Sequence, residues 1–182
     1  MTNKADLRRS IRTQLPLSAE ERAEKSQALC YAIERSEAWR SAGTVAIFAP
    51  QTAEPDVELL WAEARDKRIC YPRIAGSGME FRAVSDPATL VAGRWKLREP
   101  DPRHSPAVHL TELELLLVPG VAFTTSGARL GRGGGYYDRI LANLSTDAVT
   151  LGVCFDLQIV DFLPTEPHDQ PVRHVVTESG FH

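Results

Sequence analysis

The sequence predicts an α/β fold with three layers, α/β/α, a largely parallel central sheet and a single domain over residues 1–182. Short β-branched and apolar runs alternate along the chain with segments of helical periodicity, which is the order of a parallel sheet covered by helices. The chain is 182 residues long, enough to bury roughly two thirds of the surface of its unfolded form around one core. It contains no internal repeat and no low-complexity linker that would divide it.

The first predicted element is a helix from Lys4 to Gln14. Its apolar residues recur at every fourth position, at Leu7, Ile11 and Leu15. Successive helical residues are about 100° apart, so Lys4 and Arg8 are expected beside this apolar stripe, whereas Arg9 points further away.

Three more helices are predicted further along the chain. Ser18 and Glu21 have the spacing of a capping box, which predicts a helix from about Ala19 to Trp39. Pro55 suits the first turn of the next helix. That helix and the last one are predicted over residues 57–67 and 136–144.

Six runs rich in β-branched and apolar residues predict strands. They cover residues 44–50, 68–74, 79–84, 114–119, 148–155 and 172–178. Between Ser85 and Pro106 there are four prolines and little periodicity, which predicts a long surface loop. Long ordered loops in compact domains are often functional.

Composition narrows the class of partner. The formal net charge of −3 gives no overall attraction to nucleic acid or to an anionic membrane, so any anion site must be a local concentration of arginine and lysine. No obligate protein partner is evident. The first residues are polar and no segment approaches the length of a membrane span. The cysteines Cys30, Cys70 and Cys154 lie far apart without ligand spacing, which predicts buried thiols in a cytoplasmic protein.

The most informative stretch is LLLVPGVAFTTSGARLGRGGGYYDRIL, residues 115–141. A strand that leads into a glycine loop and then a helix places backbone N–H groups where they can bind phosphate. The P-loop pattern fails because no lysine and no Ser or Thr follow the glycines, and the dinucleotide pattern fails because Tyr136 stands where glycine is needed.

The stretch offers other groups for an anion. Arg129 and Arg132 flank Gly131, and arginine supplies a fixed fork of donors for phosphate oxygens. Asp138 could hold a magnesium ion that bridges those oxygens. The alternative is a surface turn with solvated charges, but two arginines, three consecutive glycines and an aspartate favour a nucleoside triphosphate site.

The run PGVAFTTSGARLGRGGGYYDRIL closely resembles the signature of 5-formyltetrahydrofolate cyclo-ligases, which reads roughly PGxAFDxxGxRLGxGGGYYDRxL. The resemblance extends over nearly the whole chain. Further similar blocks are KADLR at the start, FAPQTAEPDV, YPRI with WKLREP, and PHDQPVRHVVTE near the end. Several blocks in the same order are more specific than any one of them.

This resemblance implies an enzyme that uses ATP and Mg²⁺ to convert 5-formyltetrahydrofolate to 5,10-methenyltetrahydrofolate. By similarity, phosphorylation of the formyl oxygen makes it a leaving group, and N10 of the folate then closes the ring. The catalytic residues would be Arg132 and Lys4. The nucleotide would contact Lys4, Arg8, Arg129, Gly131, Arg132, Gly133, Gly134, Gly135, Tyr136 and Tyr137. The folate would contact Glu54, Arg132 and Tyr136, and the metal would be held by Asp138 and Asp169.

Several of these residues also have plainer interpretations. Lys4 and Arg8 could belong to a solvated helix face. Glu54 could be a carboxylate at a helix start, and Asp169 a turn aspartate. Trp95 and Tyr71 could flank flat rings, but aromatic residues more often serve packing.

The sequence departs from the family pattern in places. Thr124 stands where the family usually has aspartate, Arg173 replaces the closing aspartate, and some relatives carry lysine in place of Gly134. The first two of these departures, Thr124 and Arg173, leave open a non-catalytic relative that binds folate or nucleotide. A third hypothesis, a sugar-phosphate isomerase or acyl-transferase-like enzyme, rests on fold analogy alone.

Overall fold

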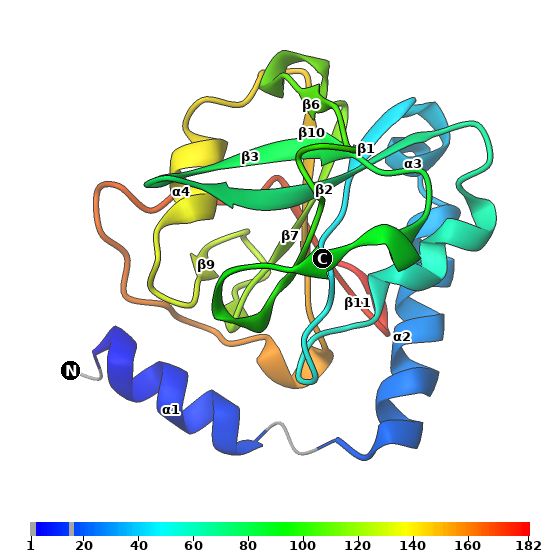
Figure 1. The fold of residues 1–182 in the computed structure, drawn as a ribbon. Helices are drawn as coiled ribbons and strands as arrows, with labels where there is room; N and C mark the ends of the chain where they lie inside the picture. Colours follow the sequence, from blue (N-terminus) through cyan, green and yellow to red (C-terminus); the bar gives the residue numbers. More distant parts are fainter. Residues whose placement is uncertain (1–2, 15–16) are drawn as a thin grey trace.

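An eight-stranded sheet forms the centre of the molecule (Figure 1), in the order β12-β11-β10-β7-β1-β2-β3-β6. The computed structural model describes residues 3–14 and 17–182. The middle five strands are parallel: β11 (His174–Thr177), β10 (Val149–Val153), β7 (Leu115–Pro119), β1 (Thr44–Ala46) and β2 (Arg68–Ala75). The edge strands are antiparallel: β12 (Gly180–Phe181), β3 (Gly78–Ala83) and β6 (Ala107–Val108).

The central strands read as continuous apolar runs because both of their faces are covered. In β7 the residues Leu115, Leu116, Leu117 and Val118 are all fully buried. Alternate side chains of a strand point to opposite faces, so Leu115 and Leu117 belong to one hydrophobic core, and Leu116 and Val118 to another. Two cores on the two faces of one sheet are the signature of a three-layer fold.

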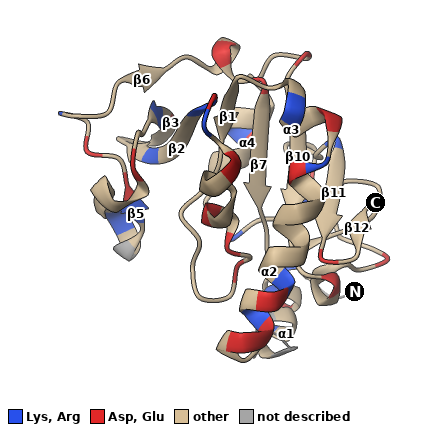
Figure 2. Ribbon diagram, turned by 90° about the vertical axis from the view of Figure 1, so that its right-hand side faces the viewer, with Lys and Arg blue, Asp and Glu red and all other residues tan. Residues whose placement is uncertain are grey.

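Helices cover the two faces. One face packs against α2 (Ala19–Glu34), α3 (Glu37–Ser41) and the 3₁₀ helix η1 (Val57–Glu63). The other face packs against α4 (Tyr136–Leu141). The exposed side of α2 carries both acidic and basic residues (Figure 2). The predicted α/β fold with a largely parallel sheet is therefore confirmed.

The first helix, α1 (Lys4–Gln14), has the predicted bounds. It lies apart from α2 and below the hairpin of β8 (Ala122–Phe123) and β9 (Arg129–Leu130) in Figure 1. Leu7 and Ile11 pack with Val121, Leu130 and Leu163 in a small separate core. Leu15, the last residue of the predicted stripe, lies outside the described residues.

The helix predicted from about Ala19 to Trp39 is wrong near its end, because α2 stops at Glu34 and a separate helix, α3, starts at Glu37. The capping box of Ser18 and Glu21 starts α2 as predicted. A second serine, Ser36, then accepts a hydrogen bond from the backbone N–H of Trp39 at 3.1 Å. Serine competes for backbone hydrogen bonds in this way and so favours helix starts over helix interiors.

The segment 85–106 is more ordered than the loop predicted from its prolines. It contains a small hairpin of β4 (Val91–Ala92) and β5 (Arg98–Glu99). Trp95 occupies its tip at φ 53°, the single positive φ of a non-glycine residue in the described chain. The segment also holds the 3₁₀ turns η2 (Pro87–Thr89) and η3 (Arg94–Lys96). Strands of two residues are too short for periodicity to reveal.

Three smaller differences concern local geometry. The segment predicted as a helix over 57–67 is the shorter 3₁₀ helix η1, which begins after Asp56. A second hairpin, β8 (Ala122–Phe123) and β9 (Arg129–Leu130), was not predicted. The remaining 3₁₀ turns are η4 (Leu110–Glu112) and η5 (Asp156–Gln158).

Across residues 3–14 and 17–182, every helix is too short or too polar to pass through a lipid bilayer.

The order of the strands places a crevice beside the carboxyl end of β1. From β1 the chain passes to β2 on one side, and after β6 it returns to β7 on the other side of β1. Where connections leave in opposite directions, the carboxyl ends of the strands leave a crevice that ligands occupy.

Candidate active site

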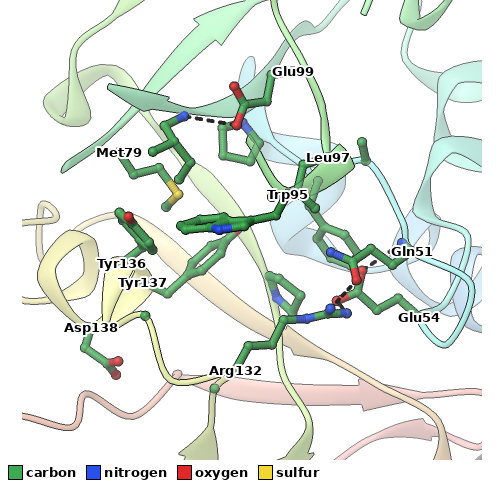
Figure 3. A pocket seen from close by; sticks show the side chains of 18 of the residues that line it. Gln51, Glu54, Met79, Trp95, Leu97, Glu99, Arg132, Tyr136, Tyr137 and Asp138 are labelled. Carbon is green, nitrogen blue, oxygen red and sulfur yellow. Dashed lines mark hydrogen bonds and ion pairs between the residues drawn. The ribbon is translucent and has the colours of Figure 1, made fainter. Parts of the chain in front are cut away.

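A cavity of about 420 Å³ lies at the carboxyl ends of β1, β2 and β7 (Figure 3). Its charged wall consists of Gln51, Glu54, Arg129, Arg132 and Asp138. Its apolar wall consists of Pro72, Ile74, Met79, Trp95 and Leu97, together with one carboxylate, Glu99. The glycine loop, residues 131–135, and the tyrosines that follow it close the cavity between the two walls.

The glycine loop needs glycine for two different reasons. Gly133 and Gly135 adopt φ values of 106° and 64°, a region that residues with a Cβ rarely enter. A Cβ on Gly131 would lie 2.7 Å from Nη1 of Arg129, and one on Gly134 would lie 2.8 Å from the ring of Tyr136. At Gly131 and Gly134 the backbone therefore lies too close to these side chains to leave room for a Cβ atom.

Arg132 joins the glycine loop to the segment after β1. Its Nη2 donates to Oε1 of Glu54 at 2.6 Å, and its Nη1 donates to the side chain of Gln51. The other carboxylate oxygen of Glu54 accepts from the backbone N–H of Gln51 at 2.9 Å. Glu54 is only 6% exposed, so its charge is balanced by Arg132 in a largely water-free place.

Arg129 is the most buried charge of the site, with a side chain 3% exposed. Its Nη2 donates to Oδ1 of Asp138 at 2.8 Å, and its guanidinium lies 5.7 Å from the ring centre of Tyr137. Its Nε is buried without a hydrogen-bond partner, alone among the buried side-chain polar atoms of the described residues. Burial raises the pKa of Tyr137 above its usual value, which keeps this hydroxyl protonated.

The helix α1 brings two cations to the other side of the glycine loop. Arg8 donates through Nε to the carbonyl oxygen of Gly131 at 2.7 Å. Lys4 donates through Nζ to Asp169 and to Glu166, both at 2.6 Å. Burial alone would lower the pKa of Lys4, but its bonds to these carboxylates outweigh burial and raise it. Arg8 and Arg132 together line a second hollow of about 400 Å³.

Most residues that the sequence analysis selected meet at this place, in two groups. The cavity is lined by Glu54, Arg129, Gly131, Arg132, Gly134, Gly135, Tyr136, Tyr137 and Asp138. Lys4, Arg8, Gly133 and Asp169 are not part of that lining. Arg8 contacts the glycine loop directly, and a Cβ on Gly133 would lie 3.8 Å from its guanidinium carbon.

The two carboxylates assigned to a metal lie on neighbouring segments. The backbone N–H of Gln170, next to Asp169, donates to Oδ1 of Asp138 at 3.4 Å. Both carboxylates are held by cations, Asp138 by Arg129 and Asp169 by Lys4. Carboxylate oxygens are the ligands that Mg²⁺ prefers, so the donor set fits this ion once the cations give way.

Glu166 is a potential ligand that the sequence analysis missed. It lies with His168 and Asp169 such that one ligand atom from each falls within 4.8 Å of the others. The signal was its place three residues before Asp169 in TEPHDQ, on the same turn.

The apolar wall contains further residues that were not predicted. Trp95, which was left undecided, lines the cavity, and its ring centre lies 6.0 Å from that of Tyr136. Tyr71, the other undecided aromatic residue, is fully buried, and its hydroxyl accepts from Trp61 and donates to Glu58. Trp95 therefore belongs to the site and Tyr71 to the core.

The two departures from the family pattern have local structural roles. Thr124 is 7% exposed, and its Oγ1 accepts from the backbone N–H of Ala128 at 3.1 Å within the β8–β9 turn. Arg173 donates to the carbonyl oxygen of Thr146 at 2.6 Å. Neither residue lines the cavity.

Comparison with known proteins gives a consistent result. The sequence profile described as the 5-formyltetrahydrofolate cyclo-ligase family matches residues 1–178. The 5-formyltetrahydrofolate cyclo-ligase of Mycolicibacterium smegmatis is 46% identical over 91 residues, which are 50% of this chain and 47% of that relative. The enzyme of the same name from Escherichia coli strain K12 is 36% identical over 146 residues, covering 76% of this chain and 79% of the relative.

A solved structure extends the similarity to the fold. The 5,10-methenyltetrahydrofolate synthetase of Aquifex aeolicus superposes with a TM-score of 0.87 at 30% identity, covering 98% of this chain and 91% of that one.

Proposed function

The chain belongs to the 5-formyltetrahydrofolate cyclo-ligase family, and we propose that residues 1–182 act as one domain that catalyses the ATP- and Mg²⁺-dependent cyclisation of 5-formyltetrahydrofolate. The products are 5,10-methenyltetrahydrofolate, ADP and phosphate. The observation that carries this proposal is a single cavity in which an apolar wall faces a wall of arginines and carboxylates across a glycine loop.

The reaction must make a formamide carbon electrophilic. Transfer of the γ-phosphoryl group of ATP to the formyl oxygen releases ADP and turns that oxygen into a leaving group. N10 of the folate then adds to the formyl carbon and loses its proton, and the C–O bond breaks to expel phosphate. The protein has to hold the two substrates in line, which can lower the barrier by about 7–11 kcal/mol, and to neutralise the charge of the moving phosphoryl group.

Arg132 is placed to serve both substrates. It lines the main cavity and the second hollow beside α1, and its guanidinium is already oriented by Gln51 and Glu54. In this proposal it donates to the oxygens of the phosphoryl group during transfer. Glu54 and Tyr136 contact the folate from either side.

The nucleotide phosphates lie against the glycine loop in this proposal. The loop supplies backbone N–H groups, Arg129 supplies a buried cation, and Lys4 and Arg8 close over the phosphates from α1. Lys4 leaves Asp169 for the phosphate oxygens, a change of partner between two anions that keeps its charge balanced.

Asp138 and Asp169 would hold Mg²⁺, since their oxygens suit it. When bound, the ion supplies positive charge against the phosphate oxygens. In this proposal Arg129 and Lys4 then turn their donors toward phosphate.

We also propose a cytoplasmic location and no partner beyond the two small substrates. Support for the location comes from the cysteines Cys30, Cys70 and Cys154, which are buried and free, as is usual where thiols stay reduced.

A direct assay tests the function. Purified protein with ATP, Mg²⁺ and 5-formyltetrahydrofolate should form the methenyl product, which absorbs in the near ultraviolet, and should form none when ATP is omitted. Folate binding without turnover would favour the non-catalytic relative, but the departures that motivated it, Thr124 and Arg173, lie outside the cavity. Turnover of a sugar phosphate without ATP would favour the third hypothesis.

A further inference from the structure

Glu99 is a buried carboxylate on the apolar wall that the proposed chemistry does not use. It belongs to β5, lines the cavity and is 6% exposed. Its Oε1 accepts one long hydrogen bond, 3.4 Å, from the backbone N–H of Ile74. The positive charges of Arg73 and Arg94 act on Glu99 without a hydrogen bond to it. These arginines donate elsewhere, to Glu80 and to the carbonyl oxygen of Gly76.

Such a carboxylate is costly to keep. Among the side chains that the structure describes, none forms an ion pair with Glu99, in contrast to Glu54 and Asp138. Burial raises the pKa of Glu99 above its usual value, because a charged carboxylate is less stable away from water than a neutral one. A buried charge is normally paired and hydrogen-bonded, so a ligand that brings N–H donors to Glu99 would relieve the deficit.

A purely structural role accounts for only part of this arrangement. Glu99 helps to fasten the β4–β5 hairpin to β2 through Ile74, but a neutral side chain could accept that bond equally well. The hairpin is also shaped around the carboxylate, because a Cβ on Gly93 would lie 2.3 Å from it. One carboxylate has about four acceptor sites, and the bond from Ile74 uses one.

The surroundings of Glu99 define the ligand that it can accept. Pro72, Ile74, Met79 and Leu97 form an apolar surface with the Trp95 ring, which suits a flat ring system. In Figure 3, Glu99 and Met79 lie on one side of Trp95, and Arg132 with Glu54 lies on the other. Glu99 and Arg132 thus bound the cavity from opposite sides, so a ring held between them would turn one edge toward Glu99 and the other toward Arg132.

Hydrogen-bond chemistry separates the two substrates at this edge. A pterin ring carries an amino group next to a ring N–H, two parallel donors that match the two oxygens of a carboxylate. The edges of adenine pair each donor with a ring-nitrogen acceptor, which a carboxylate repels. Glu54 is less free to read such an edge, because Arg132 and the Gln51 N–H already occupy its two oxygens.

We propose that Glu99 is a further substrate-binding residue, which accepts hydrogen bonds from the adjacent amino and ring N–H groups of the pterin. This inference rests on the proposed function. It assigns the two ends of the folate ring to different carboxylates, with Glu99 at the donor edge and the Arg132–Glu54 pair at the reacting end.

The test combines a protein change with a ligand change. Glu99→Gln keeps the shape of the side chain and an oxygen that accepts from the Ile74 N–H. It loses the negative charge and places an NH₂ donor against the donors of the pterin. We expect KM for 5-formyltetrahydrofolate to rise about 10- to 100-fold, as for the loss of charge-assisted hydrogen bonds. KM for ATP should stay within about twofold of the wild-type value, because the substitution changes no contact that the proposal gives to the nucleotide.

The 2-desamino analogue of 5-formyltetrahydrofolate provides the readout that a structural role would not move. The wild-type protein should bind it about tenfold more weakly than the natural substrate, whereas Glu99→Gln should no longer discriminate between the two. Glu112→Gln is the control with the same chemical change, since Glu112 pairs with Arg68 at 2.8 Å and does not line the cavity. It should retain the full preference for the amino group.

The failures of the two proposals are distinguishable. A wild-type protein that forms no methenyl product overturns the proposed function. A wild-type protein that turns over, with a Glu99→Gln variant that has unchanged KM or unchanged discrimination, overturns only the role of Glu99. If Glu99→Gln does not fold, Glu99→Asp takes its place. Asp keeps the charge but withdraws it by one methylene, and it must show the same loss of discrimination.

Discussion

The charged wall and the apolar wall of the cavity differ in how their polar groups are satisfied. On the charged wall, Arg129 pairs with Asp138 and Arg132 pairs with Glu54. On the apolar wall, Glu99 has one long hydrogen bond and packs among aliphatic side chains and Trp95. The arginines and carboxylates of the charged wall must break an ion pair to bind a ligand. Glu99 has no ion pair to break and only gains a hydrogen-bond partner. Changes to the charged wall should therefore alter the chemical step and stability, and changes to the apolar wall should alter binding.

The largest effect is expected from the charged wall, at Arg132. Arg132→Ala should lower kcat by about 10³-fold, because the phosphoryl charge loses its oriented donor. Glu54→Gln keeps the arginine but loosens it, and should cost less, about tenfold. Initial rates of methenyl formation measure both. Arg173→Ala, an arginine that binds only a backbone carbonyl through its side chain, is the control and should retain full activity. Equal rates for Arg132→Ala and wild type would remove Arg132 from the chemical step.

Arg129 tests the structural side of the same wall. Arg129→Met should lower the free energy of unfolding by about 3 kcal/mol, because Asp138 loses the counterion that accompanies its burial. Asp138→Asn in the Arg129→Met background should recover part of that loss, since no charge is then left unpaired. Denaturant unfolding without metal or nucleotide gives the values for the cycle. Additive losses in the double variant would contradict a pair.

Trp95 is the corresponding test of the apolar wall. Trp95→Ala should raise KM for the folate about tenfold with little change in kcat, because the ring supplies stacking surface and no charge. Its side chain is 65% exposed, so stability should change little.

Trp95→Gly is the matched variant for the strained backbone. It removes the same ring, but glycine tolerates the φ of 53°, so this variant should be more stable than Trp95→Ala by about 0.5–1 kcal/mol. Thermal unfolding compares the two. A folate KM that stays unchanged in both would show that the tip of the hairpin does not touch the substrate.

The smallest effect on stability is expected at the ion pair of Lys4 and Asp169, outside both walls. Bonds to Lys4 lower the pKa of Asp169 below 3.8 although burial opposes this. The pKa of Lys4 is raised above 10.5. The contribution of Asp169 is thus present above its unfolded pKa and lost as pH falls through its folded value. That of Lys4 is present below its unfolded pKa and lost as pH rises through its folded value.

The pair should therefore stabilise α1 between about pH 4 and pH 10 by less than about 1 kcal/mol, since it is partly exposed. Hydrogen exchange of α1 at pH 7 should quicken in Lys4→Met, and Arg9→Met, at an exposed position, should leave it unchanged. Protection that is equal in both variants would show that the pair does not hold the helix.

The part of the charged wall that residues 129–138 supply was predictable because it is contiguous. Residues 129–138 carry two arginines, the glycines, two tyrosines and an aspartate in one run, and the order of strand, loop and helix around them places them at one sheet edge. The apolar wall was not predictable in the same way. Ile74 and Met79 meet through the register of β2 and β3, and Glu99 joins them through a hairpin of two-residue strands.

Two further features depended on contacts that a pattern does not carry. Lys4 and Asp169 are 165 positions apart, and only the packing of α1 makes them partners. The break between α2 and α3 depended on whether Ser36 would cap or continue a helix, and apolar periodicity is compatible with either. Fold class and the glycine loop thus followed from local order, whereas the apolar wall of the cavity required the assembled sheet.

The bond between Arg132 and Glu54 also ties the site to the completion of folding. It joins positions 78 residues apart, and it forms only when β7 has inserted beside β1, because the two segments leave those strands. Closing so long a loop is slow compared with forming local structure. Without Arg132, burial of the Glu54 carboxylate has no counterion to offset its desolvation cost. This cost disfavours a sheet of β1 and β2 that forms before β7 joins it. The guanidinium of Arg132 therefore reaches its oriented position, against Glu54, only when the two halves of the sheet have come together.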